Sequence, residues 1–412
     1  MAKFTKAGDQ KLLQSLNRNL VLNTIHHYDA ISRIEISKLT KLSQSTVSNV
    51  VDALQKEGYV VEIGSGQSTK SGGRKPTILT IDPEGGSILA VAVVTEAFHI
   101  TLQICLFDLK LRIIKETEKE LSQKGLALIE AIKETVREFI HDHADQKLIG
   151  IGFSIPTVLN RQGVIFRGHL LELENYPLES ELQKAFPKLP IMVEQEQHAA
   201  IMGERTAGPA KQEENLIYVT VGRGIGSSVI VNNRLMLGEY GGAGEIGHMS
   251  INKYGGKCIC GKNGCLRLYA TELAFINKIK EAIANELPVS HKVYNPSVDK
   301  INVKEVYAEA LSGDPFCKEM LYSLLDDLCI GLSNLIYLIN PKMIVLGGNL
   351  LIAKEIVIPY VSEKIRDIVD SPASEIQVLA ASLGSKSSVY GAASMVLDKH
   401  FLKKDFLLNE AK

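Results

Sequence analysis

The chain has 412 residues, of which 45% are apolar and 23% charged, and its formal net charge is −1. This length predicts two or three domains, and the apolar content is ample for full cores. No apolar run follows the opening MAKFTKAGDQK, and the most apolar region, 328–353, is interrupted by Ser, Asn, Pro and Lys residues. We therefore expect neither a signal peptide nor a membrane span, and a cytoplasmic location.

The net charge hides an asymmetry between the front of the chain and the rest. Residues 1–80 carry 11 Lys and Arg against 6 Asp and Glu, a net of +5. Residues 81–412 carry 35 against 41, a net of −6. A basic first segment on an otherwise acidic chain favours a polyanion as the partner of that segment.

The basic segment predicts three short helices. A helical spacing of apolar residues over 10–28 indicates the first, with the stripe Leu12, Leu13, Leu16, Leu20, Val21 and Ile25. Ser32 can cap a second helix, RIEISKLT, and Ser43 a third, QSTVSNVVDALQKEG, which should end at Gly58. The side chains expected to face inward are Ile36, Leu39, Leu42, Val47, Val50, Val51 and Leu54.

The start of the third helix then presents short hydrogen-bonding side chains to solvent. These are Gln44, Ser45, Thr46, Ser48 and Asn49. Side chains of this kind at the start of a recognition helix contact base edges and phosphates. They are the predicted DNA-binding residues of the helical part.

Two strand-like runs at 59–63 and 77–81 flank the stretch GSGQSTKSGGRKP. This pattern predicts a hairpin with a basic tip, the wing of a winged helix-turn-helix. Arg74, with its neighbours Lys70 and Lys75, is suited to a minor groove or to phosphates. The alternative is a small helical subdomain with a solvated charge run. The agreement of charge, caps, polar face and basic hairpin favours DNA binding.

From residue 87 onward strands alternate with helices, which predicts an α/β fold. The expected strands include ILAVAVV, ITLQICLFD, LIGIGFSI, 191–193, 216–220 and MIVLGGN, and the expected helices are 127–142, 316–339 and the closing SVYGAASMVLDKHF. Gly222, Gly224 and Gly226 follow the strand at 216–220. They allow either a tight hairpin or a loop whose N–H groups approach a phosphate or sugar.

One imidazole and three thiols lie within a short glycine-rich stretch, GEYGGAGEIGHMSINKYGGKCICGKNGCL. His248, Cys258, Cys260 and Cys265 are the ligand types that Zn²⁺ prefers, and four of them close a tetrahedron without a catalytic water. The stretch therefore predicts a structural zinc site, against an alternative of three free thiols and an unrelated histidine. The remaining cysteines, Cys105, Cys317 and Cys329, lie in apolar segments as expected for core residues in a reducing compartment.

The sequence GEIGH at 244–248, followed by CICGKNGC at 258–265, resembles the signature of the ROK family of repressors, open reading frames and kinases. With SGGRKP in a winged helix, the chain is similar to the repressor branch, which includes xylose, glucose and N-acetylglucosamine repressors. The resemblance implies a winged helix-turn-helix at 1–82 and an α/β actin-like, two-lobed sugar-binding domain at 83–412. Lobe 1 would comprise about 83–200 and a C-terminal helix at about 386–402, and lobe 2 about 201–385. It also implies homodimers or homotetramers on a palindromic operator.

Kinases of this family carry D-x-G-G-T after the first strand, where this chain has VVTEA at 93–97. Their catalytic aspartate lies in V-E-N-D-A, where this chain has VEQEQ at 193–197, so Glu196 is one methylene longer. A misplacement of about 1 Å can cost on the order of a hundredfold in rate. Without a phosphate cradle the transfer also loses its electrostatic support. We therefore expect no kinase activity, although xylose repressors share this glutamate and are expected to retain sugar binding.

The resemblance also implies the ligand site. Glu196, its neighbour Gln195, and Glu245 of the G-E-x-G-H motif match sugar-contacting positions, and His248 matches a zinc ligand beside the pocket. His169 lies where relatives often have a sugar-contacting asparagine. Arg267 replaces a glutamate that contacts the sugar in the kinases, and the family's Pro-Gly turn is Pro156-Thr157. For the two glutamates the alternative is an ordinary surface or capping role.

The expected function is a sugar-responsive DNA-binding repressor that is not an enzyme. Its partners are operator DNA, a sugar or sugar-derivative effector, and a second copy of the chain. One alternative is an active sugar kinase with a fused DNA-binding module. Another is a repressor that senses a sugar phosphate or a transporter protein, which the cation at Arg267 favours.

Overall fold

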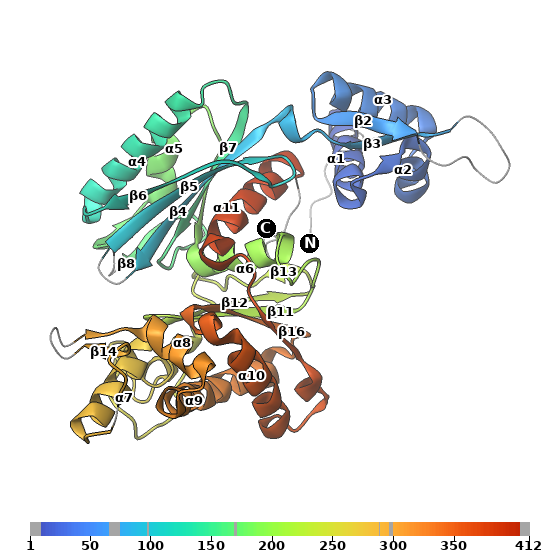
Figure 1. Cartoon of the computed structure of the whole chain (residues 1–412). Coiled ribbons are helices and arrows are strands. Elements are labelled where there is room, and N and C mark those ends of the chain that lie inside the picture. Colours follow the sequence, from blue (N-terminus) through green and yellow to red (C-terminus); the bar gives the residue numbers. More distant parts are fainter. Residues whose placement is uncertain are drawn as a thin grey trace.

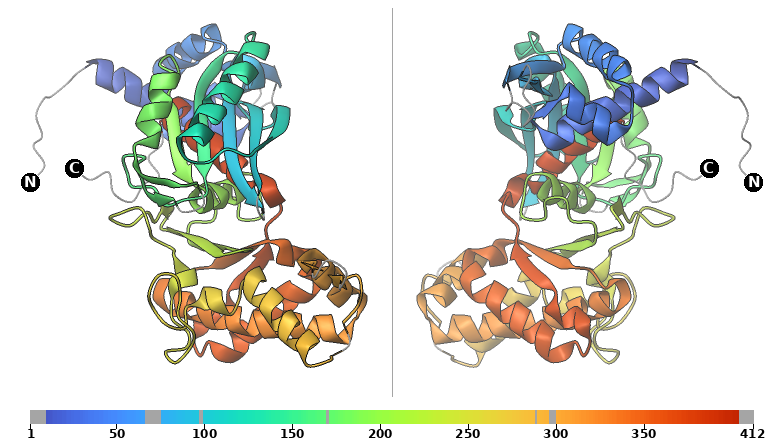
Figure 2. Two further views of the ribbon diagram at one scale, coloured as in Figure 1. Left: turned by 90° about the vertical axis from the view of Figure 1, so that its left-hand side faces the viewer. Right: turned by 90° about the vertical axis from the view of Figure 1, so that its right-hand side faces the viewer.

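The computed structural model describes residues 10–65, 75–96, 99–168, 171–287, 289–295 and 300–403. The described chain forms a small helical domain and two larger lobes (Figure 1). The small domain lies beside the first lobe, and the second lobe lies below the first in these views (Figure 2).

The small domain is a winged helix, as the sequence predicts. Helix α2 begins with a capping box in which the Ser32 side chain and the Glu35 side chain each bond the other residue's backbone N–H. Helix α3 begins at the Ser43 cap, whose Oγ accepts from Thr46 N at 3.1 Å. A third strand, not predicted, completes a sheet of order β1-β3-β2. The elements are α1 (Gln10–Tyr28), β1 (Ile31–Ser32), α2 (Arg33–Thr40), α3 (Gln44–Lys56), β2 (Val60–Ser65) and β3 (Thr77–Ile81).

One detail of the predicted winged-helix core is wrong. Leu39 is 51% exposed. It lies three residues after the buried Ile36, which is about 60° short of a full helical turn, so Leu39 stands at the edge of the side of α2 that packs on the core. The front of the predicted stripe on α1 is exposed as well, at Leu12, Leu13, Leu16 and Leu20. Only the rear of α1, at Val21, Leu22 and Ile25, reaches the core.

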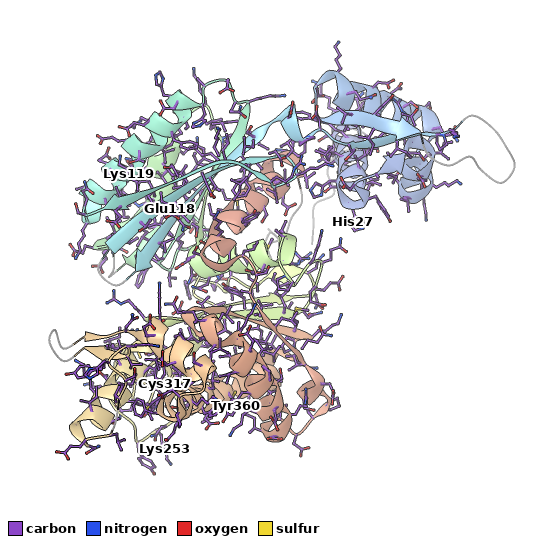
Figure 3. The ribbon with its side chains drawn as sticks, in the orientation of Figure 1. His27, Glu118, Lys119, Lys253, Cys317 and Tyr360 are labelled. Atoms are coloured by element: carbon purple, nitrogen blue, oxygen red, sulfur yellow. The ribbon has the colours of Figure 1, made fainter. Side chains whose placement is uncertain are left out.

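Lobe 1 is built on a five-stranded sheet of order β10-β7-β4-β5-β6. Strands β4, β7 and β10 are parallel, β5 is antiparallel to β4, and β6 is antiparallel to β5. The edge strand β6 was not predicted, since charged residues such as Glu118 and Lys119 fill its exposed length (Figure 3) and protect an edge from pairing. The strands are β4 (Ser87–Glu96), β5 (His99–Asp108), β6 (Ile113–Leu121), β7 (Leu148–Ile155) and β10 (Ile191–Gln195), with a side hairpin of β8 (Ile165–Gly168) and β9 (Leu173–Tyr176).

Alternating residues of these strands face two different helix layers. One face packs on α4 (Gly125–Asp142) and α5 (Leu178–Ala185), through residues such as Leu89 and Val91. The other face packs on α6 (Glu196–Thr206) and α11 (Ser387–Val396). These two helices cross so closely that a Cβ on Gly391 would collide with the Ala199 carbonyl.

Lobe 2 has a second five-stranded sheet, of order β13-β12-β11-β16-β17. Its elements are β11 (Leu216–Val221), β12 (Ile225–Val231), β13 (Arg234–Leu235), β16 (Met343–Gly348), β17 (Gln377–Ala380), α7 (Glu272–Ala284), α8 (Val303–Ser312), α9 (Pro315–Ile339) and α10 (Lys354–Ile368), with a small hairpin of β14 (Tyr294–Asn295) and β15 (Lys300–Ile301). Among the described residues α9 alone has the length and apolar composition of a membrane span, a test that a core helix also passes. Its inner face, including Leu321, Leu328 and Leu335, is buried in the lobe.

The winged helix is held against lobe 1 by contacts beyond the connecting chain. Asp29 pairs with Lys110 at 2.6 Å. The ring of Tyr59 contacts the Lys147 ammonium, which is 4.3 Å from the ring centroid, and the Phe401 ring, with 4.9 Å between the two centroids. Phe401 belongs to a π-helical turn, Leu397–Phe401, that continues α11. One continuous apolar core therefore joins the winged helix, α11, α6 and the near face of lobe 2.

Candidate functional site

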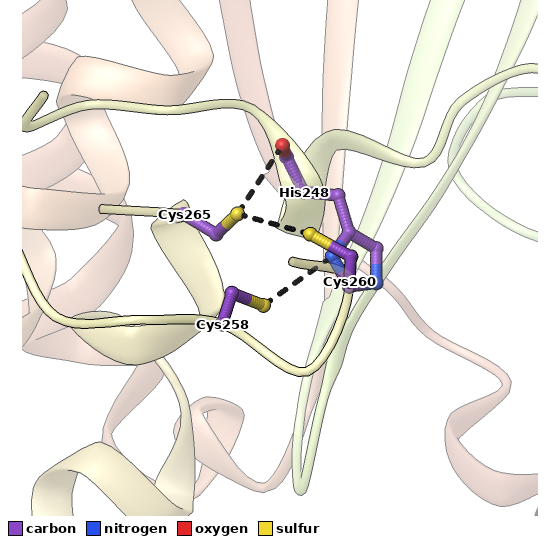
Figure 4. Close-up of side chains that lie close together, drawn as sticks. All are labelled: His248, Cys258, Cys260 and Cys265. Atoms are coloured by element: carbon purple, nitrogen blue, oxygen red, sulfur yellow. Dashed lines mark hydrogen bonds between the residues drawn. The ribbon is translucent and has the colours of Figure 1, made fainter. Parts of the chain in front are cut away.

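The four predicted metal ligands lie together on the loops between β12 and α7. His248 ends a short 3-10 helix (Ile246–His248), and Cys265 precedes another (Leu266–Leu268). Figure 4 shows the side chains of His248, Cys258, Cys260 and Cys265 turned toward one another, and their ligand atoms all lie within 4.8 Å. Cys258 Sγ is 3.6 Å from His248 Nδ1, and Cys260 Sγ is 3.6 Å from Cys265 Sγ.

These separations fit a tetrahedral metal site. With metal–sulfur bonds near 2.3 Å and metal–nitrogen bonds near 2.0 Å, neighbouring ligands of a tetrahedron lie about 3.5–3.8 Å apart. Burial, and next the charge of Arg267, lower the pKa of His248, which favours the neutral imidazole that a metal requires. The glycine at 264 has a φ of 64°, and a Cβ there would collide with the Asn252 carbonyl. The loop therefore depends on glycine to bring Cys265 back to His248.

The predicted recognition residues lie at the exposed start of α3. Gln44, Ser45 and Asn49 are exposed, and Thr46 and Ser48 are half-buried. Ser43 Oγ lies 2.9 Å from Ser45 Oγ and 2.8 Å from Thr46 Oγ1, so the cap and the first turn form one hydroxyl cluster. The wing tip, with Lys70 and Arg74, lies outside the described residues, and Lys75 at its base is exposed.

Arg33 is the basic side chain that sequence reasoning missed on this domain. It pairs with Asp52 at 2.7 Å and donates to Gln55 Oε1 at 2.9 Å. It also lies 3.8 Å from Glu62 on the wing strand β2. Arg33 thus holds α2, α3 and the wing in one arrangement, a role that becomes visible only when three separate elements are placed together.

Two of the predicted ligand residues meet where the lobes join. Gln195 ends β10 in lobe 1 and is 7% exposed, and its Nε2 donates to Glu245 Oε1 of lobe 2 at 3.4 Å. The Gln195 Oε1 is buried without a hydrogen-bond partner among the described residues. A buried amide oxygen normally has a donor, so this atom is available to a ligand hydroxyl.

Glu196 begins α6 at the same junction. Burial of its carboxyl group raises the pKa of Glu196 to about 7. Arg267 lies on the lobe 2 side beside Gly247, and His169 lies outside the described residues. The structure therefore brings Gln195, Glu196 and Glu245 to one junction.

Further polar residues under this junction were missed by sequence reasoning. His198 Nδ1 lies 2.9 Å from Glu194 Oε1, and both side chains are largely buried. The Ser154 hydroxyl on the neighbouring strand β7 is buried without a partner among the described residues. Spacing in the sequence could have paired Glu194 with His198 on a helix, but α6 begins only at Glu196.

Two hollows on the described surface lie elsewhere. One, at the end of α9, is lined by residues that include Tyr337 and Pro372, and another, at its start, by residues that include Tyr322 and Asp326. Neither includes a predicted ligand residue. The junction is the candidate ligand site on its chemistry, since its polar groups converge from two lobes.

Models of two known protein families match separate parts of the chain. The model of the ROK family matches residues 99–399, and the model of the MarR family matches residues 15–62. The xylose repressor of Caldicellulosiruptor bescii is 31% identical over 402 residues, covering 95% of this chain and 97% of that protein. The xylose repressor of Bacillus subtilis is 31% identical, covering 96% and 98%. The Escherichia coli transcriptional dual regulator NagC is 27% identical, covering 94% of both.

Solved structures agree on the fold. A ROK family transcriptional regulator, described as a homologue of the E. coli MLC protein, has a TM-score of 0.82 at 22% identity, covering 95% of this chain and 98% of that chain. A ROK family glucokinase from Streptomyces griseus, in complex with glucose and AMPPNP, has a TM-score of 0.65 at 25% identity. It covers 75% of this chain and 99% of the glucokinase. A winged helix therefore precedes a two-lobed domain with the fold of the sugar kinases.

Proposed function

The chain belongs to the ROK family, and on that premise we propose that it is a sugar-responsive transcriptional repressor. The observation that carries this proposal is the joining of a MarR-type winged helix to the two-lobed ROK domain in one chain. We assign residues 1–82 to DNA binding and 83–412 to effector binding. Relatives that are similar over nearly their whole length are named repressors.

The winged helix would bind DNA as a symmetric pair on a palindromic operator. One recognition helix reads only a few base pairs, so specific affinity comes from two half-sites on one face of the duplex. The exposed side chains of Ser45 and Asn49 at the start of α3 support base contacts. Removal of residues 1–82 should abolish operator binding in a gel-shift assay, and unchanged binding would overturn the proposal.

A single substitution tests the recognition helix more finely. Asn49→Ala should cost about 1–3 kcal/mol of discrimination between the operator and a version changed at one base pair. The same exchange at Asn17 on α1 is the matched control and should leave the discrimination unchanged. Anisotropy titrations on both DNAs at one salt concentration measure the difference. Equal discrimination by Asn49→Ala and the unmodified protein would remove Asn49 from the interface.

The effector would be a sugar bound at the lobe junction. Glu245 and Glu196 supply carboxyl groups from opposite lobes, and adjacent sugar hydroxyls suit such groups. The relatives' names make D-xylose the first ligand to test, followed by D-glucose and N-acetylglucosamine. Thermal unfolding measures binding directly, because a ligand at 100 times its Kd stabilises the folded state by about 2.7 kcal/mol.

The contacts of α6 and α11 suggest how the ligand would reach the DNA-binding domain. Glu196 begins α6 next to Gln195 of the junction, and the buried Glu204 near the end of α6 accepts from Ser387 Oγ of α11 at 2.6 Å. The turn after α11 carries Phe401, and the Leu402 carbonyl accepts from Asn23 Nδ2 of α1 at 2.7 Å. A rotation between the lobes would thus be passed to the winged helix through α11 as well as through 81–86.

The same domain would not transfer phosphate. Glu196 replaces the aspartate of the kinases, and VVTEA stands in place of their phosphate-binding motif. The His248 and cysteine cluster would hold a structural Zn²⁺, which cross-links the loop that carries Glu245. An ATP hydrolysis assay with the three sugars tests the first point. Turnover above background would favour a kinase with a fused DNA-binding domain.

A further inference from the structure

Gln197 connects the two lobes at their junction, and it is not one of the predicted ligand residues. Gln197 is the second residue of α6. Its Oε1 accepts from Thr220 Oγ1 at 2.9 Å, and its backbone carbonyl accepts from Ser228 Oγ at 2.7 Å. Thr220 and Ser228 lie on β11 and β12, so Gln197 is tied to both strands of the lobe 2 hairpin.

The amide of Gln197 fills the space beside a particular glycine of that hairpin. A Cβ on Gly226 would lie 2.6 Å from Gln197 Nε2 and 2.7 Å from Gln197 Cγ. By contrast, a Cβ on Gly222 or on Gly224 would meet no atom within 4 Å. The glycine-rich turn is therefore open at its tip and covered by Gln197 at its third glycine.

This position matters because of where the hairpin lies in the sheet. Strands β11 and β16 are parallel, and their carboxyl ends, Val221 and Gly348, are paired. Ligands of open α/β sheets bind outside the carboxyl ends of parallel strands. Glycine turns at such ends let backbone N–H groups approach phosphate oxygens closely. A side chain that covers Gly226 takes up part of the space that a phosphate would need.

We infer that Gln197 is a specificity-determining residue that closes this glycine turn to phosphate-bearing ligands, so that the junction accepts an unphosphorylated sugar. The inference rests on the proposed function in taking the junction as the effector site. A neutral amide offers no charge to a phosphate, and its hydrogen bond to Thr220 and its packing on Gly226 must be lost before the space opens. The effector pocket thus ends at Gln197.

The first test uses the ATP analogue AMPPNP with Mg²⁺ as the phosphate-bearing probe, titrated calorimetrically into the full chain. Gln197→Ala removes the obstacle and should bind the probe at least about tenfold more tightly than the unmodified protein, which is the effect of losing roughly one hydrogen bond and its packing. Gln197→Glu keeps the size and the acceptor atom and adds a negative charge, so it should show no gain. Equal binding by Gln197→Ala and the unmodified protein, or an equal gain in Gln197→Glu, would overturn the inference.

A second test reads the packing without any ligand. Gly226 has a backbone conformation that alanine can adopt, so Gly226→Ala should lower the midpoint of urea unfolding mainly because its Cβ displaces Gln197, whose atoms are the three nearest to it. In the Gln197→Ala background the same substitution should shift the midpoint by less than half as much. An equal shift in both backgrounds would contradict the contact. Neither test involves DNA, so a failure of the repressor proposal and a failure of this inference are told apart.

Discussion

Glu245 and His248 lie three residues apart on one short helical turn, yet they belong to two sites of opposite construction. The cluster of His248 with Cys258, Cys260 and Cys265 takes all four candidate metal ligands from the loops of lobe 2 between β12 and α7. The lobe junction takes Gln195 and Glu196 from lobe 1 and Glu245 from lobe 2. A site built within one lobe stays fixed when the lobes move, whereas a site built across two lobes changes with their arrangement. If the proposed function holds, the first site positions Glu245, and the second senses the ligand.

The largest expected effect is the loss of metal from the cluster of His248 and the three cysteines. Cys260→Ser removes one thiolate from a closed tetrahedral site, so the bound metal should fall well below one per chain in elemental analysis. The loop that carries Glu245 should also become more accessible to hydrogen exchange. Cys317→Ser, a buried thiol outside the cluster, is the control and should keep its metal. A Cys260→Ser protein that retains a full equivalent of zinc would contradict the assignment.

The next effect belongs to the junction and concerns pH. The pKa of Glu196 is raised from 4.5 to about 7 by burial, so the folded state holds this proton more tightly than the unfolded state does. The free energy of unfolding should therefore fall as pH rises from about 4.5 to 7 and then level off, by at most about 3 kcal/mol from this group.

Denaturant unfolding at a series of pH values measures this contribution. Glu196→Gln should remove the slope in that window, because the amide does not titrate. Glu239→Gln, at an exposed position, should leave the slope as it is. Parallel profiles for the unmodified protein and Glu196→Gln would show that the Glu196 carboxyl is solvated as it is in the unfolded chain.

The smallest expected effect lies at the far end of α11. Phe401→Leu removes the edge-to-face contact with Tyr59, which is 4.9 Å between centroids and is of a type that contributes about 0.5–1.5 kcal/mol. We expect weaker coupling between sugar and operator, with the affinity for each ligand alone nearly unchanged. Tyr28→Leu, an exposed ring on the same domain, is the control. Coupling that is unchanged in Phe401→Leu would leave the connection at 81–86 as the path.

The two sites also differ in how far the sequence predicts them. The cluster of His248 and the three cysteines can be predicted because its residues are close together in the sequence. The winged helix can be predicted because Ser32 and Ser43 mark the starts of two helices, which the structure confirms. The Gln197 contact with Thr220 and Gly226 joins residues that only the packing of two lobes brings together. The edge strand β6 was missed for a different reason, since alternating charges on an exposed strand carry no hydrophobic period.

The central claim, that a sugar at the lobe junction controls DNA binding, is tested most directly at Glu245. Operator affinity is measured by fluorescence anisotropy with and without D-xylose, D-glucose or N-acetylglucosamine, for the unmodified protein and Glu245→Gln. The sugar that acts should weaken operator binding of the unmodified protein by about 5- to 150-fold, a coupling of about 1–3 kcal/mol. Glu245→Gln should bind the operator equally well without sugar and lose the response, because it changes the effector site and not the DNA contacts. A Glu245→Gln protein that still responds fully would show that the effector binds elsewhere.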